Sequence, residues 1–115
     1  MKKVIVFTLL IVCAFRSYAE TFSCSGKVKN VAIGPTTAIL QVNSGYGMHY
    51  LCSFKEVKNG VDPETCKAWY SMFLAAQASK REVSQSYSTS SGETCASLGS
   101  WVTPDPFPYF VNVLE

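Results

Sequence analysis

The chain has 115 residues, of which 48% are hydrophobic, and its ten basic and eight acidic side chains give a formal net charge of +2. A chain of this length makes one domain. The near balance of charge excludes the strongly basic surface with which proteins neutralise the phosphates of nucleic acid. Five cysteines in so short a chain suggest that it contains disulfide bonds.

Residues 1–19 have the features of a cleaved secretory signal peptide. Two lysines near the start are followed by a largely apolar run at residues 4–12, and Ser17 and Ala19 are small residues at the −3 and −1 positions of a cleavage site. The apolar run is too short to span a bilayer, which takes about 20 residues. We therefore expect a single exported domain over residues 20–115, periplasmic or secreted, with no membrane span.

Cleavage would change both the charge and the cysteine count. Three basic residues lie in residues 1–19, so seven basic and eight acidic side chains remain, a net charge of −1. Cys13 is also removed, which leaves Cys24, Cys52, Cys66 and Cys95. An even count in a small exported chain predicts two disulfides, for which three connectivities are open. A zinc site would need close cysteine pairs or histidines, and His49 is the single histidine, so we expect no metal and no cofactor.

The first half of the exported chain predicts three strands. Residues 22–33 form the first, which ends at the turn signal Gly34-Pro35. Residues 36–42 are rich in β-branched and apolar side chains, so these two segments are expected to form a hairpin. Residues 48–54 alternate in the period-two pattern of a third strand.

A single helix is expected over residues 64–79. Asp62 is a typical N-cap residue, Pro63 suits the first helical position, and Glu64 is favourable in the first turn. The face that we expect to pack on the core consists of Cys66, Trp69, Tyr70, Phe73, Leu74 and Gln77.

The last third of the chain predicts two more strands. Val83, Gln85 and Tyr87 alternate with serines in the fourth strand, and a polar loop follows at residues 88–93. Three prolines within residues 101–109 forbid a central strand there, and residues 110–114 make the last strand. The order β-β-β-α-β-β predicts a β-rich α+β fold like the OB-fold. The OB-fold is a five-stranded Greek-key barrel with one helix between strands 3 and 4, and in this chain we expect disulfides to stabilise it.

Three parts of the sequence resemble a known family. Tyr50-Leu51-Cys52 is followed by a polar connection containing Gly60, a second cysteine and a helix that carries Trp69, Phe73 and Leu74. Pro108-Tyr109-Phe110-Val111-Asn112 and Ser25-Gly26 match in the same way. These segments resemble the B subunits of subtilase cytotoxin and of the typhoid-toxin type, over residues 22–87 and 107–113. The resemblance implies a homopentameric OB-fold that binds sialylated or related host-cell glycans, carries no catalysis and accompanies an exported A subunit.

The resemblance also implies sites. Glycan would meet the first strand near Ser25, whose hydroxyl can donate and accept hydrogen bonds. Lys27 would bind a sialic acid carboxylate, and Tyr46 would supply a stacking face. The cysteine pair of the family corresponds to Cys52–Cys66, which joins the third strand to the helix start. That pairing leaves Cys24–Cys95, although a Cys66–Cys95 bridge stays open.

Catalysis is not expected. His49 lies on the outward side of its strand and is expected at the surface, Asp62 is explained by capping, and Asp105 sits between two prolines in a turn. A Ser-His-Asp set would have to use one of those aspartates. Binding is the better class, because Trp101, Phe107 and Tyr109 lie in a proline-rich segment where aromatic rings are hard to bury, unless Trp101 plugs the end of the barrel.

Two functions are therefore open. The first is a glycan-binding oligomer like the toxin B subunits. The second is a monomeric periplasmic protein-binding module, an inhibitor or immunity-type protein with no glycan ligand.

Overall fold

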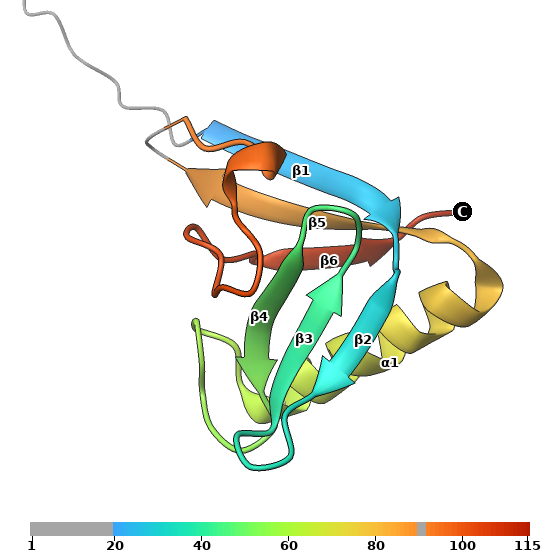
Figure 1. Cartoon of the computed structure of the whole chain (residues 1–115), viewed down its shortest axis with the longest axis vertical. Helices are drawn as coiled ribbons and strands as arrows, with labels where there is room; N and C mark the ends of the chain where they lie inside the picture. Colours follow the sequence, from blue (N-terminus) through green and yellow to red (C-terminus); the bar gives the residue numbers. More distant parts are fainter. Residues whose placement is uncertain (1–19, 90–91) are drawn as a thin grey trace, which may run out of the picture.

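The computed structural model describes residues 20–89 and 92–115, so the signal peptide expected at residues 1–19 lies outside the described residues. Six strands form two antiparallel three-stranded sheets, with strand orders β1-β5-β6 and β2-β3-β4 (Figure 1). The elements are β1 Glu20–Lys27, β2 Asn30–Ile33, β3 Ile39–Asn43, β4 Met48–Ser53, α1 Pro63–Ser79, β5 Glu82–Thr89, the short 3-10 helix η1 Cys95–Ser97 and β6 Phe110–Val113.

The first predicted strand is two strands. The chain leaves the first sheet after Lys27 and enters the second at Asn30, and the Lys29 amide already donates to the Asn43 carbonyl at 2.7 Å. Val28, between the two strands, is buried. The expected β-rich fold with one helix and two disulfides is present, but the structure has six strands in two sheets, with no ladder joining the sheets within residues 20–89 and 92–115, so a closed five-stranded barrel is not confirmed.

The helix begins where the sequence predicts. The Asp62 side chain accepts hydrogen bonds from the Thr65 hydroxyl at 2.5 Å and the Thr65 amide at 3.4 Å. These hydrogen bonds lower the pKa of the Asp62 carboxyl, and the bond from the Thr65 hydroxyl has the largest effect. The helix ends at Lys80, which adopts a left-handed conformation (φ 57°) and directs its N–H to the last carbonyls.

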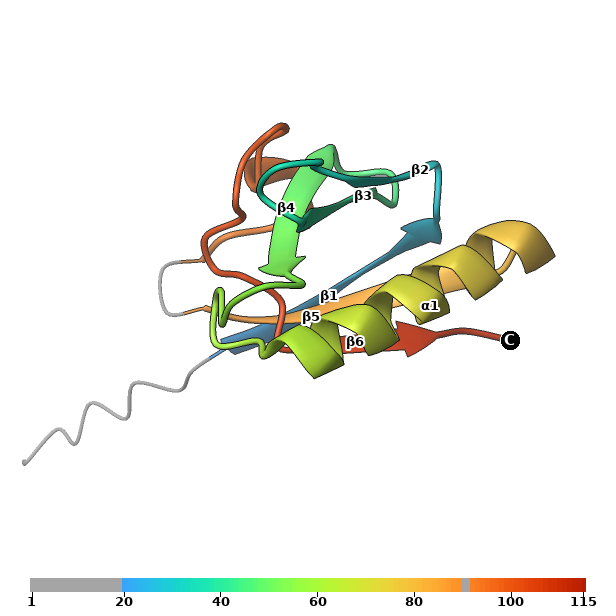
Figure 2. The ribbon, with the colours of Figure 1, turned by 90° about the horizontal axis from the view of Figure 1, so that it is seen from below.

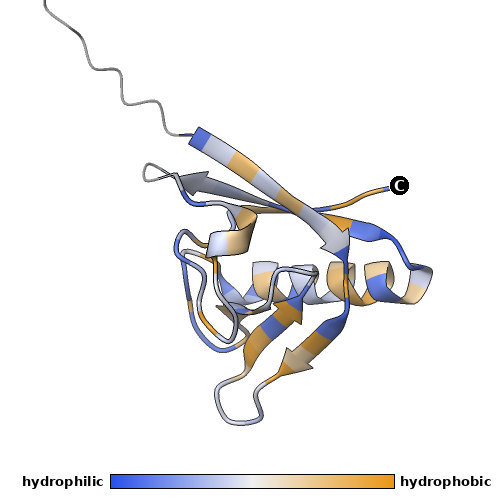
Figure 3. Ribbon diagram, turned by 45° about the horizontal axis from the view of Figure 1, so that its top comes forward, coloured by the Kyte–Doolittle hydropathy of each residue, from blue (hydrophilic) through white to orange (hydrophobic). Residues whose placement is uncertain are grey.

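The core lies between α1 and both sheets, and the helix runs alongside the strands (Figure 2). Apolar residues recur along the second sheet and along the helix (Figure 3). The buried residues of the helix are Cys66, Trp69, Phe73 and Ala76. Of the expected core face, Tyr70 is only half-buried, and Leu74 and Gln77 are exposed, so the buried stripe is narrower than expected.

Two disulfides join the elements. Cys52–Cys66 links β4 to α1, and Cys24–Cys95 links β1 to η1, each with Cα atoms 5.7 Å apart. The favoured pairing is the one present, and the open Cys66–Cys95 alternative is not formed. A second small cluster of Cys24, Tyr87 and Leu98 surrounds the Cys24–Cys95 bridge, with Phe22 stacked on Tyr87 at a centroid distance of 5.0 Å.

The two sheets meet at a close contact that we name the sheet junction, formed by Gly26, Ser44, Tyr46 and Gln85. A Cβ atom on Gly26 would lie 2.1 Å from the Ser44 carbonyl oxygen, so only glycine permits this approach. The Ser44 hydroxyl donates to Gln85 Oε1 at 2.8 Å, and the Tyr46 hydroxyl donates to the Ser25 carbonyl at 2.6 Å. The turn between β3 and β4 is thereby fixed against β1 and β5.

Phe73→Ala should lower the free energy of unfolding by about 3–5 kcal/mol, because the ring is fully buried and its loss leaves a cavity. Its neighbour Leu74 is 39% exposed, and Leu74→Ala should cost about 1 kcal/mol or less. Chemical denaturation of both variants tests this. Equal losses in the two variants would contradict the core assignment.

Gly26→Ala should lower the free energy of unfolding by about 1–3 kcal/mol, because the added methyl group would clash with the Ser44 backbone carbonyl, which cannot move aside as a side chain can. Gly60→Ala is the matched control, since nothing lies within 4 Å of a Cβ there and its only cost is the positive φ of 73°. Thermal melts of the two variants compare these costs. A Gly26→Ala variant as stable as wild type would show that the sheets can separate freely.

Candidate functional site

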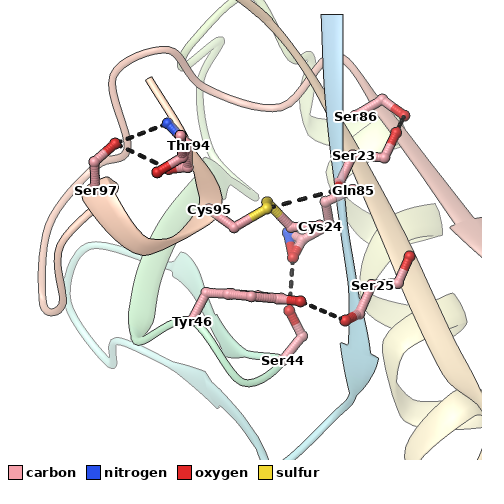
Figure 4. The surroundings of a disulfide bond; sticks show 10 residues. All are labelled: Ser23, Cys24, Ser25, Ser44, Tyr46, Gln85, Ser86, Thr94, Cys95 and Ser97. Atoms are coloured by element: carbon pink, nitrogen blue, oxygen red, sulfur yellow. Dashed lines mark hydrogen bonds between the residues drawn. A yellow bond between two sulfur atoms is a disulfide. The ribbon is translucent and has the colours of Figure 1, made fainter. Parts of the chain in front are cut away.

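One face of the first sheet is covered with hydroxyl groups. Side chains alternate across a strand, and the inward positions of β1 and β5 hold buried residues such as Cys24 and Tyr87. Of the eight outward positions on these two strands, two are Lys27 and Glu82, and six carry hydroxyl groups: Thr21, Ser23, Ser25, Ser84, Ser86 and Ser88. We name these six residues the hydroxyl face. In Figure 4, Ser23, Ser25 and Ser86 turn to one side of the strands, and Cys24, Gln85 and Tyr46 lie on the other.

The strand register arranges the hydroxyl face in rows. Two rows cross three strands, Ser23–Ser86–Phe110 and Ser25–Ser84–Asn112, and two rows cross only β1 and β5, Thr21–Ser88 and Lys27–Glu82. Side chains directly opposite one another in such pairs have Cβ atoms about 4.5–5.5 Å apart. The Ser23 and Ser86 hydroxyls are accordingly hydrogen-bonded at 3.1 Å. The face thus has an aromatic side chain at Phe110 near one end and a charged pair at the other.

The structure brings two of the three residues with an expected glycan role to one surface. Ser25 and Lys27 are both exposed on the outward side of β1. Tyr46 approaches β1 from the opposite side, where its hydroxyl is engaged by the Ser25 carbonyl and its ring packs against the cluster around the Cys24–Cys95 bridge (Figure 4). The glycan role of these residues stays a prediction.

Phe110 is a candidate that sequence reasoning did not single out. It is 54% exposed and stands beside Ser86 on the outer surface of β6. The alternation of Phe110 and Asn112 with Val111 and Val113 in the last strand could have indicated an outward Phe110. The alternation alone does not say which residues lie next to the ring.

The site is a surface rather than a cavity. Across residues 20–89 and 92–115 the protein has no pocket, and no three side chains of His, Cys, Asp or Glu gather as metal ligands. Small-molecule sites are usually concave. A ligand of the hydroxyl face would therefore lie against it and leave one side in solvent.

Residues 99–109, which we name the strap, run beside β4 to the start of β6. The Trp101 amide donates to the Met48 carbonyl at 2.7 Å, and the Tyr50 amide donates to the Val102 carbonyl at 3.0 Å. At the other end, the Tyr109 amide donates to the Ser86 carbonyl at 3.0 Å. The strap is thus held to both sheets.

His49 is buried beneath the strap, so the expectation of a surface histidine is wrong. Its side chain is 2% exposed, and Nε2 lies 2.9 Å from the Gly99 carbonyl oxygen, to which it donates when that nitrogen carries the proton. The alternation of β4 marked His49 as outward, but the strap, about fifty residues later in sequence, covers that side.

The aromatic side chains of the strap are exposed, which agrees with the expectation that rings in this proline-rich segment are hard to bury. Trp101 is 65% and Tyr109 57% exposed, and Phe107 is also at the surface, so Trp101 does not plug the fold. Trp101 has a φ of 61°, a left-handed conformation that is rare for a bulky residue. Backbone strain of this kind concentrates at functional positions.

Tyr87, by contrast, is a structural residue. Its ring is fully buried between Phe22 and the Cys24–Cys95 bridge, and burial, with a smaller contribution from Tyr46, raises the pKa of its phenol above the ordinary value. The phenol therefore stays neutral at physiological pH.

Comparison with known proteins gave no matching family model, no similar curated protein and no similar solved structure. No helix in the part of the chain that the structure describes is long and apolar enough to cross a membrane. The two disulfides agree with an extracellular or periplasmic location.

Trp101→Gly should leave the free energy of unfolding within about 1 kcal/mol of wild type, or raise it, because glycine relieves a left-handed conformation that costs other residues about 1–2 kcal/mol. The matched control is Trp69→Ala, which removes a buried tryptophan from the helix and should cost about 3–5 kcal/mol. Denaturant titration measures both. A large loss in Trp101→Gly would mean that the exposed ring supports the fold.

Proposed function

We propose that the protein is an exported, non-catalytic binding protein that recognises host glycans through the hydroxyl face and acts as an oligomer. The observation that supports this most is the composition of that face: six of the eight outward positions on β1 and β5 carry hydroxyl groups. A serine or threonine hydroxyl both donates and accepts hydrogen bonds, as sugar hydroxyls do. A regular array of such groups suits a ligand that is itself a polyol.

Lys27 gives the face a preference for acidic sugars. Its ammonium group is exposed at the end of β1, two residues from Ser25 and on the same side. A carboxylate of the sialic acid type would form a charge-assisted bond with it while neighbouring sugar hydroxyls meet Ser25 and Ser84. The Glu82 carboxylate faces Lys27 across the strand pair and lowers the gain from this contact, because it repels any acidic group of the ligand.

The flatness of the site supports an oligomer. A ligand that keeps one side in solvent forms few contacts, so single-site affinity is weak. Several sites on one ring would raise the avidity by about 10²–10⁴. A homopentamer that carries an exported A subunit, as the family resemblance implies, meets this requirement.

The strand order agrees with an OB-like fold as the framework for this function. One extended segment, Glu20–Ile33, serves both sheets, and α1 lies between the strands of the second sheet and β5 in sequence. In this reading β1 and β2 are the two halves of one bent strand, and the strap occupies the position at the edge of β4 that barrel closure would otherwise use.

A second candidate function is favoured by the strap. Trp101, Phe107 and Tyr109 are exposed on a backbone that is tied to both sheets, and rigid exposed aromatic side chains are typical of binding hot spots in protein interfaces. A monomeric protein-binding module, of the inhibitor or immunity type, would use this surface and leave the hydroxyl face unoccupied.

Ser25→Ala and Lys27→Ala should each weaken binding to sialylated glycans by about three- to tenfold, since each removes one hydrogen bond or charge contact. The measurement is a glycan array followed by titration of the purified mature protein, with light scattering for its oligomeric state. Ser71→Ala and Lys67→Ala, exposed on α1, are the matched controls and should bind as wild type does. Failure of a confirmed monomer to bind any glycan would favour the protein-binding function.

A further inference from the structure

Phe110 occupies the aromatic end of the hydroxyl face. Its ring stands opposite Ser86 in the row that Ser23 begins, and 54% of the side chain is exposed although the residue lies within a strand. The ring–ring contacts of the described residues are Phe22–Tyr87 and Phe54–Tyr70, so Phe110 is not stacked on another aromatic. An apolar ring is thus displayed at the edge of an otherwise polar surface.

The surroundings of Phe110 match one chemical class of ligand. Beside it are the serine hydroxyls of its own row and, two residues along β6, the exposed amide of Asn112. The nearest charged residues by register, Lys27 and Glu82, lie two rows further along the sheet. A neutral pyranose ring combines an apolar C–H face with equatorial and axial hydroxyls, so it can pack on the Phe110 ring and hydrogen-bond to its neighbours at the same time.

The separation between the two ends of the face sets the size of the ligand. Lys27 lies four residues from Ser23 along β1, which is roughly 13 Å at the rise of a strand. Phe110 lies two strands across from Ser23, about 9–10 Å further in the perpendicular direction. A single sugar ring cannot touch both ends, whereas an extended oligosaccharide can.

We propose that Phe110 is the stacking residue of a second subsite, and that the ligand is an extended oligosaccharide with an acidic sugar at Lys27 and a neutral pyranose packed on the Phe110 ring. This inference rests on the proposed glycan-binding function. It adds a requirement for chain length, and it assigns to Phe110 the stacking role that the family resemblance implies for Tyr46.

The test is a length series with one common acidic terminus: free N-acetylneuraminic acid, the trisaccharide sialyllactose and a sialylated pentasaccharide, titrated against the purified mature protein. Wild type should bind the longer glycans about three- to tenfold more tightly than the monosaccharide, the gain expected from one aromatic contact. Phe110→Ala should lose this gain and bind all three alike, and Phe110→Tyr should retain it.

The controls distinguish loss of the Phe110 subsite from misfolding and from loss of the contact at Lys27. Phe107→Ala removes an exposed phenylalanine from the strap and should keep the length dependence. Lys27→Ala should weaken binding of all three glycans by a similar factor. Unchanged circular dichroism and melting temperature of Phe110→Ala exclude misfolding as the cause.

The possible outcomes are distinct. If wild type binds all lengths equally, or if Phe110→Ala keeps the length dependence, the second subsite is wrong while the glycan-binding function stands. If no member of the series and no other glycan binds, both proposals fail. Loss of the gain in Phe110→Ala alone, with Phe107→Ala and Phe110→Tyr intact, supports the subsite.

Discussion

The contact between Gly26 and the Ser44 carbonyl is the constraint on which the arrangement of the two sheets depends. With no Cβ on Gly26, the β3–β4 turn approaches β1 closely enough for Ser44 to bond with Gln85 and for Tyr46 to reach the Ser25 carbonyl. Gln85 Nε2 is buried at this contact and has no hydrogen-bond partner among the residues that the structure describes, so the Gln85 side chain makes fewer hydrogen bonds than it could. The close approach at Gly26 and the two hydrogen bonds together hold the β3–β4 turn against the first sheet.

The elements that the sequence predicted well are those determined by neighbouring residues. Asp62 and Pro63 mark the helix start through local capping, and the buried positions of β5 follow from simple alternation. The break between β1 and β2 was not predictable in this way, because the sequence has no turn signal before Gly34-Pro35, whereas the partner strand changes from β5 to β3 between Lys27 and Asn30. His49 was missed for a related reason, since its cover comes from the strap.

The residues of the candidate site also differ in whether the sequence could place them. Ser25 and Lys27 could be placed on one surface from their spacing in a strand, and the structure puts both on the outer side of β1. Tyr46 could not be placed, because its position depends on how closely the β3–β4 turn approaches β1. The row that joins Phe110 to Ser86 depends on the pairing of β5 with β6, which local pattern leaves open.

The two faces of the first sheet differ: the inward face stabilises the fold, and the outward face is the one that we propose for glycan binding. Inward side chains of β1 and β5 are buried with the Cys24–Cys95 bridge, so their replacement would cost packing energy. Six of the eight outward positions on β1 and β5 are serine or threonine, and five of these are serine, although β-branched and aromatic side chains would favour a strand more. Pairing of β5 with neighbours on both edges compensates for that weak preference. Small side chains also leave the sheet surface open to close approach, which bulkier residues would prevent, and this is the property that a flat recognition surface requires.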